Sequence, residues 1–130
     1  MAENQWKKEQ LFFSGDDFYA SISNDIEKAQ NNIDVECYIF DYDEIGKSLS
    51  EKLTAAAQRG VKVRVIVDGI GSAYSASALR SHFHKSGVEF KIFHPIFGSW
   101  FMPVFRTINR RNHRKIWMFD DRIAYAGSYN

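Results

Sequence analysis

Alternation of apolar and polar residues is the clearest regular pattern in this chain. It is strongest over residues 61–67, where every second residue is valine. Because successive side chains of a strand point to opposite faces, this pattern predicts a half-buried strand. The same alternation predicts a strand over residues 33–39, and shorter apolar runs predict strands over residues 8–13 and 88–93. The chain therefore has four candidate strands before residue 100.

Three segments between these strands have apolar residues three or four positions apart, which predicts helices with one buried face. The first helix is expected to begin with Asp16 as its N-cap, and the second to begin at about residue 43 and end at Gly60. The third is expected to begin at Ser75 or Ser77. The apolar positions are Phe18, Ile22, Ile26 and Ala29 in the first helix, Ile45, Leu49, Leu53 and Ala57 in the second, and Leu79 and Phe83 in the third.

Strands that alternate with helices predict an α/β fold with a largely parallel sheet flanked by helices, here as one domain over residues 1–130. The chain is expected to close with an antiparallel pair, because the polar pair 120–121 separates two apolar runs and is typical of a two-residue hairpin turn. In that register Ser128 lies opposite His113, and Ala126 lies opposite Lys115. Opposed residues share a face of the sheet.

The polar residues of this predicted hairpin follow the spacing H-x-K-x4-D-x6-G-S-x-N. They are His113, Lys115, Asp120, Ser128 and Asn130. An imidazole, an ammonium group, a hydroxyl and an amide on one face would suit a phosphate, since they supply a nucleophile or base, a fixed cation and neutral donors. Each residue alone has an ordinary structural explanation. Their joint spacing inside apolar strands favours a functional site, because burying unpaired polar groups costs several kcal/mol.

This spacing is the HKD motif, and the chain resembles the phospholipase D superfamily, most closely the bacterial cardiolipin synthases. The resemblance extends from about Leu11 to Asn130 and includes residues 36–46, 55–72 and 111–115. One difference is that these synthases commonly carry Gly-Gly where this chain has Gly-Ser at 127–128. The resemblance implies a phospholipase D-like half with one HKD hairpin.

The resemblance also implies a mechanism. His113 would attack the phosphodiester phosphorus to form a covalent phosphohistidine, and Lys115, Ser128 and Asn130 would hold the non-bridging oxygens. Asp120 belongs to the catalytic motif, although its position at the turn suits orienting the hairpin better than touching substrate. Family members use two HKD motifs and this chain has one. We therefore expect the N-terminal half of a longer enzyme, completed by a second HKD domain in the same chain or by a homodimer partner.

Charge and aromatic content suggest the class of substrate. Residues 70–119 contain eight bases and one acid, whereas residues 1–60 contain twelve acids and six bases. A positive field would attract anionic substrates. The irregular segment 94–110 combines aromatic and basic residues, which suits an anionic phospholipid substrate and a membrane surface, although a loop folded over the core is an equal alternative. Glu36 and Tyr38 either reach the site or pair with Arg or Lys.

These observations lead to a phosphatidyltransferase as the first hypothesis for function. The alternatives are a superfamily nuclease, a hydrolytic phospholipase or, for this chain alone, a non-catalytic anion-binding module; nucleic acid is the less favoured partner. The single Cys37 indicates no disulfide framework. No Cys/His cluster has zinc spacing, so neither a metal nor a cofactor is expected. The expected location is the bacterial cell membrane, with the fragment itself soluble and any anchor outside this chain.

Overall fold

The computed structural model describes residues 6–93 and 114–128, which form a single mixed sheet with helices packed on it. The five strands lie in the order β3-β2-β1-β4-β5. Strands β1, β2 and β3 are parallel, whereas β4 runs antiparallel to β1 and β5 antiparallel to β4. The elements are α1 (Gly15–Lys28), β1 (Asn32–Cys37), α2 (Glu44–Gln58), β2 (Lys62–Asp68), α3 (Ala76–Phe83), β3 (Glu89–Phe93), β4 (Lys115–Phe119) and β5 (Ile123–Ala126). The predicted largely parallel α/β sheet with a closing antiparallel pair is confirmed.

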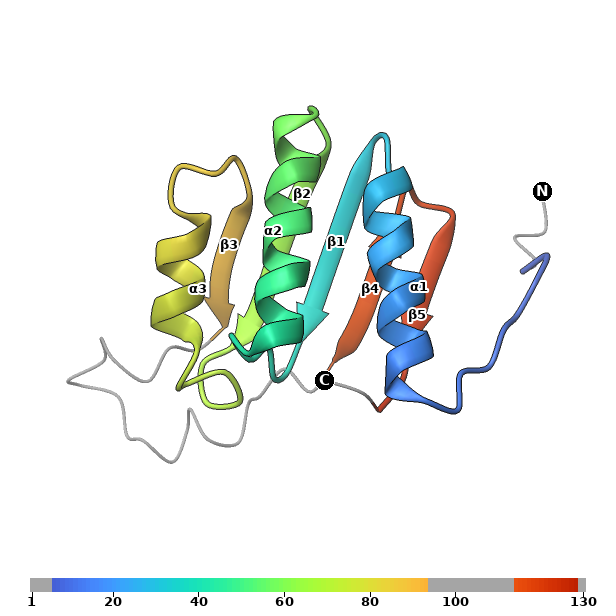
Figure 1. Ribbon diagram of the computed structural model, residues 1–130, viewed down its shortest axis with the longest axis horizontal. Helices are drawn as coiled ribbons and strands as arrows, with labels where there is room; N and C mark the ends of the chain where they lie inside the picture. The colour runs from blue at the N-terminus through green and yellow to red at the C-terminus, as the bar shows by residue number, and fades with distance from the viewer. Residues whose placement is uncertain (1–5, 94–113, 129–130) are drawn as a thin grey trace.

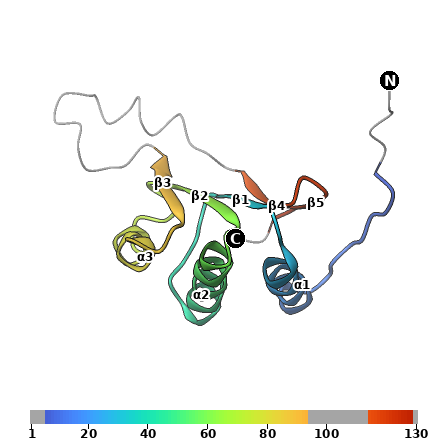
Figure 2. The ribbon, with the colours of Figure 1, turned by 90° about the horizontal axis from the view of Figure 1, so that it is seen from above.

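The three helices cover the same face of the sheet, as Figure 2 shows. The core lies between the helices and the sheet. There the inward residues of β1 and β2 are buried against the apolar stripes of the helices. Strands β1 and β2 are each followed by a helix that returns the chain to the start of the next strand. The carboxyl ends of β1, β2 and β3 therefore meet at one edge of the sheet, where β4 begins and β5 ends (Figure 1). We call this edge the carboxyl edge, and the opposite one the amino edge.

Capping side chains mark the starts of α1 and α2, and a glycine follows the end of α2. Ser14, not the predicted Asp16, is the N-cap of α1, and its hydroxyl accepts a hydrogen bond from the Asp17 amide at 3.1 Å. Asp43 caps α2 by accepting from the Gly46 amide at 2.8 Å. Gly60 follows α2 with φ +96°, a conformation that suits glycine. The expected second-helix start is confirmed, and of the two expected starts of the third helix, Ser75 is the one that precedes α3.

One strand prediction was wrong, and another was wrong in part. Residues 8–13 form no strand, because no described neighbouring strand offers them backbone partners. Phe12 packs instead against the rings of Phe18 and Tyr125, with centroids 5.7 and 6.0 Å apart. The strand predicted over residues 33–39 ends at Cys37, where the chain leaves the sheet toward α2.

Candidate active site

The motif hairpin is present, but its register differs from the prediction by one residue. Phe119 pairs with Ile123 and Ile116 pairs with Ala126, so the predicted pairing of Ala126 with Lys115 was wrong. The reason lies in the turn: the loop has three residues, 120–122, and its two aspartates both adopt positive φ, 52° and 53°. The described ladder ends at Ile116–Ala126. Ser128 lies beyond it as an exposed residue in a bend.

Lys115 is held at the carboxyl edge by the central strand. It is the first residue of β4, and its backbone partner is Cys37, the last residue of β1. The half-buried Lys115 places its ammonium group 5.6 Å from the centroid of the Tyr38 ring. A cation over an aromatic face is attracted by the ring quadrupole. The hairpin therefore presents a positive charge of defined position where the parallel strands end.

Arg114, directly before the lysine, has a different neighbour. Its guanidinium lies 3.2 Å from the Glu36 carboxylate. Glu36 alternates with the buried residues Val35 and Cys37, so it points away from the helices. Of the two alternatives for Glu36 and Tyr38, pairing with Arg or Lys is observed for both, and the partner of Tyr38 is the motif lysine itself.

Asp120 directly follows β4 at the end opposite Lys115, and the strand between them spans about 13 Å from Lys115 to Phe119 at ~3.3 Å per residue. Its carboxylate accepts hydrogen bonds from the backbone amides of Gln30 at 3.0 Å, Asn31 at 2.7 Å and Asn32 at 3.0 Å. These bonds join the hairpin turn to the connection between α1 and β1. Partial burial tends to raise the pKa of the Asp120 carboxyl, but the three backbone bonds outweigh it and the pKa lies below its usual range.

Tyr125, on the second strand of the hairpin, connects the hairpin to α1. The hydroxyl of this β5 residue bonds to Ser21 at 2.7 Å and also donates to Asp25, both on α1. Burial raises the pKa of Tyr125 to about 12, with the neighbouring carboxylate acting in the same direction. Asp120 thus ties the hairpin to the α1–β1 connection and Tyr125 ties it to α1, and this orients β4 on β1.

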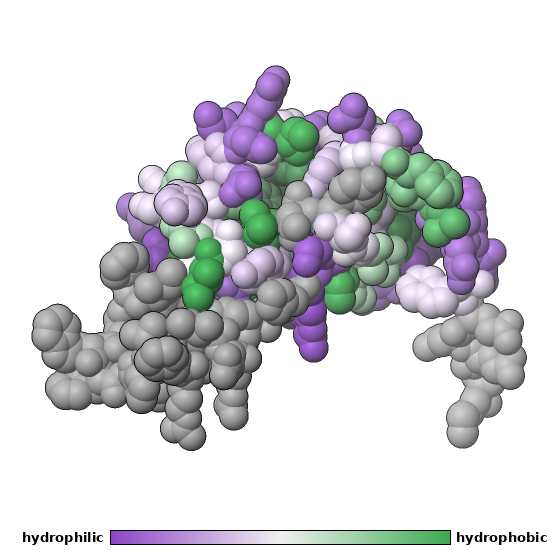
Figure 3. All heavy atoms as spheres, turned by 90° about the horizontal axis from the view of Figure 1, so that it is seen from below, coloured by the Kyte–Doolittle hydropathy of each residue, from purple (hydrophilic) through white to green (hydrophobic). Residues whose placement is uncertain are grey.

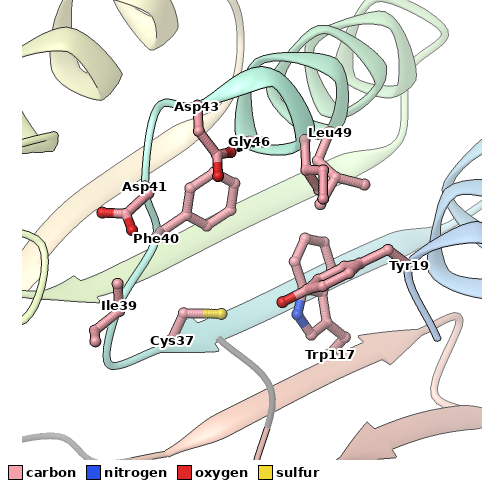
Figure 4. Close-up of a pocket in the computed structure, with 10 residues that line it drawn as sticks. Tyr19, Cys37, Ile39, Phe40, Asp41, Asp43, Gly46, Leu49 and Trp117 are labelled. Carbon is pink, nitrogen blue, oxygen red and sulfur yellow. Dashed lines mark hydrogen bonds between the residues drawn. The ribbon is translucent and has the colours of Figure 1, made fainter. Parts of the chain in front are cut away.

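A small cavity of about 70 Å³ opens beside this arrangement, and no sequence pattern indicated it. Figure 4 shows the Cys37 sulfur directed toward Trp117 and Tyr19. The lining residues come from separate elements, which is why no periodicity marks them: Tyr19, Cys37, Ile39, Phe40, Asp41, Asp43, Ile45, Gly46, Leu49 and Trp117. Burial raises the pKa of the Cys37 thiol to about 12, so the thiol is protonated at neutral pH and does not compete as a nucleophile.

The connections at the carboxyl edge are packed tightly against one another. A Cβ atom on Gly46 would lie 1.8 Å from the carbonyl oxygen of Asp41, and one on Gly71 would lie 2.2 Å from that of Tyr38. The Ser72 hydroxyl accepts from the Phe40 amide at 2.9 Å. The β2–α3 loop therefore supports the segment that carries Tyr38, and through it the position of Lys115.

Comparison with known proteins agrees with this geometry. The protein family described as "Cardiolipin synthase, PLD-like domain" matches residues 22–130. The chain belongs to this family. It is 40% identical over 121 residues to cardiolipin synthase B of Salmonella typhi, and the aligned region covers 93% of this chain and 29% of that protein. It is 37% identical over 120 residues to cardiolipin synthase of Clostridium perfringens, covering 92% of this chain and 24% of that protein. The PLD-like chain thus spans about a quarter of the length of these relatives.

Solved structures share the fold of this PLD-like domain. NucT from Helicobacter pylori matches with a TM-score of 0.62 and 19% identity, covering 88% of this chain and 67% of that one. Nuc from Salmonella typhimurium, a phospholipase D family member, matches with a TM-score of 0.57 and 20% identity, covering 78% and 56%. At such identities the likeness establishes the phospholipase D fold and nothing finer.

Two of the predicted site residues, His113 and Asn130, lie outside the described residues, as does the segment 94–110. Lys115, Asp120 and Ser128 lie within them. In the described part of this PLD-like domain, no group of three His, Cys, Asp or Glu side chains could hold a metal ion. No described helix has the length and apolar character needed to cross a bilayer. The roles of the five motif residues stay predictions.

Proposed function

We propose that this chain supplies one HKD half-site of a cardiolipin synthase-like phosphatidyltransferase. The observation that carries the proposal is the position of Lys115, which the hairpin and Tyr38 hold at the carboxyl end of the central strand. Ligands of open α/β sheets bind outside the carboxyl ends of their strands. The family match over residues 22–130 supports the same reaction class.

In this mechanism the His113 imidazole attacks phosphorus, an N–P bond forms, and the P–O bond to the departing alcohol breaks. The histidine of a second motif protonates that alcohol. It then takes the proton of the acceptor hydroxyl, whose oxygen attacks phosphorus and displaces His113. Lys115 neutralises the charge on the non-bridging oxygens in both steps, with Ser128 and Asn130 as neutral donors. A fixed ammonium needs no reorganisation when this charge develops.

The decisive experiment supplies the full-length protein with phosphatidylglycerol vesicles and identifies the products by mass spectrometry. The proposal expects cardiolipin and free glycerol. Phosphatidic acid without cardiolipin would identify a hydrolytic phospholipase instead. Cleavage of single-stranded DNA without lipid turnover would identify a nuclease, which the basic character of residues 70–119 would serve equally well.

Turnover by the full-length protein is expected to need no divalent metal ion. Lys115 already provides the positive charge that a metal would bring to the phosphate. We expect the rate with a soluble diester such as bis-p-nitrophenyl phosphate to be unchanged by EDTA. A loss of that rate in EDTA, restored by one divalent ion, would contradict a metal-free site. The soluble substrate removes any effect of the ion on a lipid surface.

The 130-residue chain alone is expected to bind anions and to turn over phosphodiesters negligibly. The transfer needs a second proton-transfer group within hydrogen-bond reach of the leaving oxygen, and this chain has one motif histidine. Phosphate or sulfate should raise the melting temperature of the chain slightly, because both bind the folded state. Lys115→Gln should remove that rise, whereas Lys85→Gln, an exposed lysine outside the motif, should retain it. Robust turnover by a monomer of this chain would exclude the two-motif mechanism.

A further inference from the structure

Exposed hydrophobic side chains are unevenly distributed between the two edges of the sheet. At the carboxyl edge, each connection to a helix carries one: Phe13 before α1, Ile45 in the first turn of α2 and Tyr74 before α3, while Phe93 ends β3. Tyr74 is fully exposed, and Phe13 is 89% exposed. Figure 1 places the starts of all three helices and the end of β3 at this same edge.

The amino edge is different. Among the described residues at the amino edge, one exposed large hydrophobic side chain, Ile123, lies next to a connection. The other exposed side chains of that edge are mainly polar or charged. The remaining exposed hydrophobic residues are Trp6 and Leu11 in the N-terminal segment and Met118 within β4. Of the eight exposed large hydrophobic side chains among the described residues, four therefore gather at the edge that carries Lys115 and one lies at the amino edge.

We propose that Phe13, Ile45, Tyr74 and Phe93 insert into the surface of a lipid bilayer and so set the carboxyl edge of this domain against it. This inference rests on the proposed function, in which a diester headgroup must reach Lys115 from a membrane. Side chains with aromatic or branched apolar ends are stable at the depth of the headgroups. With the carboxyl edge against the lipid, the phosphate layer lies level with the motif lysine.

The spacing of these side chains favours lipid over a protein partner. They occur one to a connection, with charged residues such as Asp43 and Lys47 between them, and Figure 3 shows hydrophobic and hydrophilic side chains interspersed on this edge. A protein interface usually has a contiguous apolar core from which charged residues are depleted. Single apolar side chains that enter the headgroup region need no contiguous patch, because each is surrounded by lipid.

Electrostatics sets the expected kind of membrane binding. The described residues of this edge carry both signs of charge. Asp16, Asp17 and Glu44 lie in the first helical turns, and Lys47, Arg114 and Lys115 lie near them, so the edge has no strong net attraction for an anionic surface. Binding through the four side chains should therefore occur on zwitterionic lipid. It should also be insensitive to salt, because burial of apolar area is not screened by ions.

The test is flotation of the 130-residue chain with phosphatidylcholine vesicles at low and high salt. Phe13→Ser/Tyr74→Ser should lower the vesicle-bound fraction by about tenfold or more at both salt concentrations, since two apolar rings no longer leave water. The control is Met118→Thr/Ile123→Thr, which removes two exposed hydrophobic side chains away from the carboxyl edge and places a β-branched residue, suited to a strand, at both positions. The control should bind like wild type.

Equal loss by both variants, no loss by either, or no binding of the wild-type chain would overturn the proposal. A change from dimer to monomer caused by Phe13→Ser/Tyr74→Ser without vesicles would also overturn it, and would identify a second copy as the occupant. An unchanged melting temperature shows that each variant is folded; Phe13 and Tyr74 are mostly exposed, whereas Met118 and Ile123 are 38% and 45% exposed. Vesicle binding is measured without turnover, so failure of the phosphatidyltransferase proposal would be seen in the product assay alone.

Discussion

Replacing His113 with alanine or asparagine in the full-length protein abolishes phosphodiester turnover and leaves the melting temperature unchanged. Without the imidazole, no N–P bond forms, and the reaction loses the two-step path that covalent catalysis provides. We expect the rate to fall by roughly 10³-fold or more, as for other residues that act as a unit with their partners. The measurement is the initial rate with bis-p-nitrophenyl phosphate and with phosphatidylglycerol.

His84 offers the matched control for this experiment. It is exposed at the end of α3 and lies outside the motif, so His84→Ala changes the same side chain at a position without a proposed role. The control should retain the wild-type rate. Full activity of the His113 variants toward both substrates, together with unchanged stability, would remove His113 from the mechanism, both as a nucleophile and as an acid.

Replacing Asp120 with alanine destabilises the fold by about 2 kcal/mol, because three backbone amides of the α1–β1 connection lose their acceptor. Part of the loss also comes from placing alanine at positive φ. Asp121→Ala separates the two effects, because Asp121 has nearly the same φ but accepts one side-chain bond, from Asn32 at 3.1 Å. Chemical denaturation of the three proteins measures the difference.

The stability contributed by Asp120 should also depend on pH in a defined direction. Its pKa is lowered in the folded state, because the backbone bonds outweigh desolvation. The contribution is therefore fully present above the unfolded pKa, about 3.9, and is lost as the pH falls through the lower folded value. The stability difference between wild type and Asp120→Asn should shrink below about pH 4. A difference that is constant with pH would mean that ionisation of Asp120 does not support the turn.

Asp120→Asn also separates the two roles that the motif suggests for this residue. If Asp120 positions the hairpin, a folded Asp120→Asn protein should keep a rate close to wild type at neutral pH, since asparagine tolerates positive φ and keeps one acceptor oxygen. If its carboxylate takes part in the chemistry, the rate should fall although the fold is retained. Its distance along β4 from Lys115 favours the positioning role.

Periodicity alone predicted most of the elements of this fold. The valines of β2 and the apolar stripe of α1 are buried as the spacing of apolar residues required, since one face of each element must leave water. The motif letters predicted the superfamily, and the polar pair predicted that a hairpin turn lies there, although not its length of three residues. These features are local, so a stretch of about ten residues contains all the information they need.

Tertiary structure decided the features that depend on distant partners. Residues 8–13 have the composition of a strand, but a strand also needs a neighbouring strand to bond with its backbone amides. Phe12 packs instead against the rings of Phe18 and Tyr125. The hairpin turn has three residues where the sequence predicted two, and its Asp120 bonds to Gln30, Asn31 and Asn32, which lie 88 to 90 positions earlier in the chain. The contact between Lys115 and the Tyr38 ring likewise joins two elements that are far apart in the sequence. Sequence spacing determined which polar groups this domain carries, whereas contacts between separate elements decided where Lys115 and Asp120 are held.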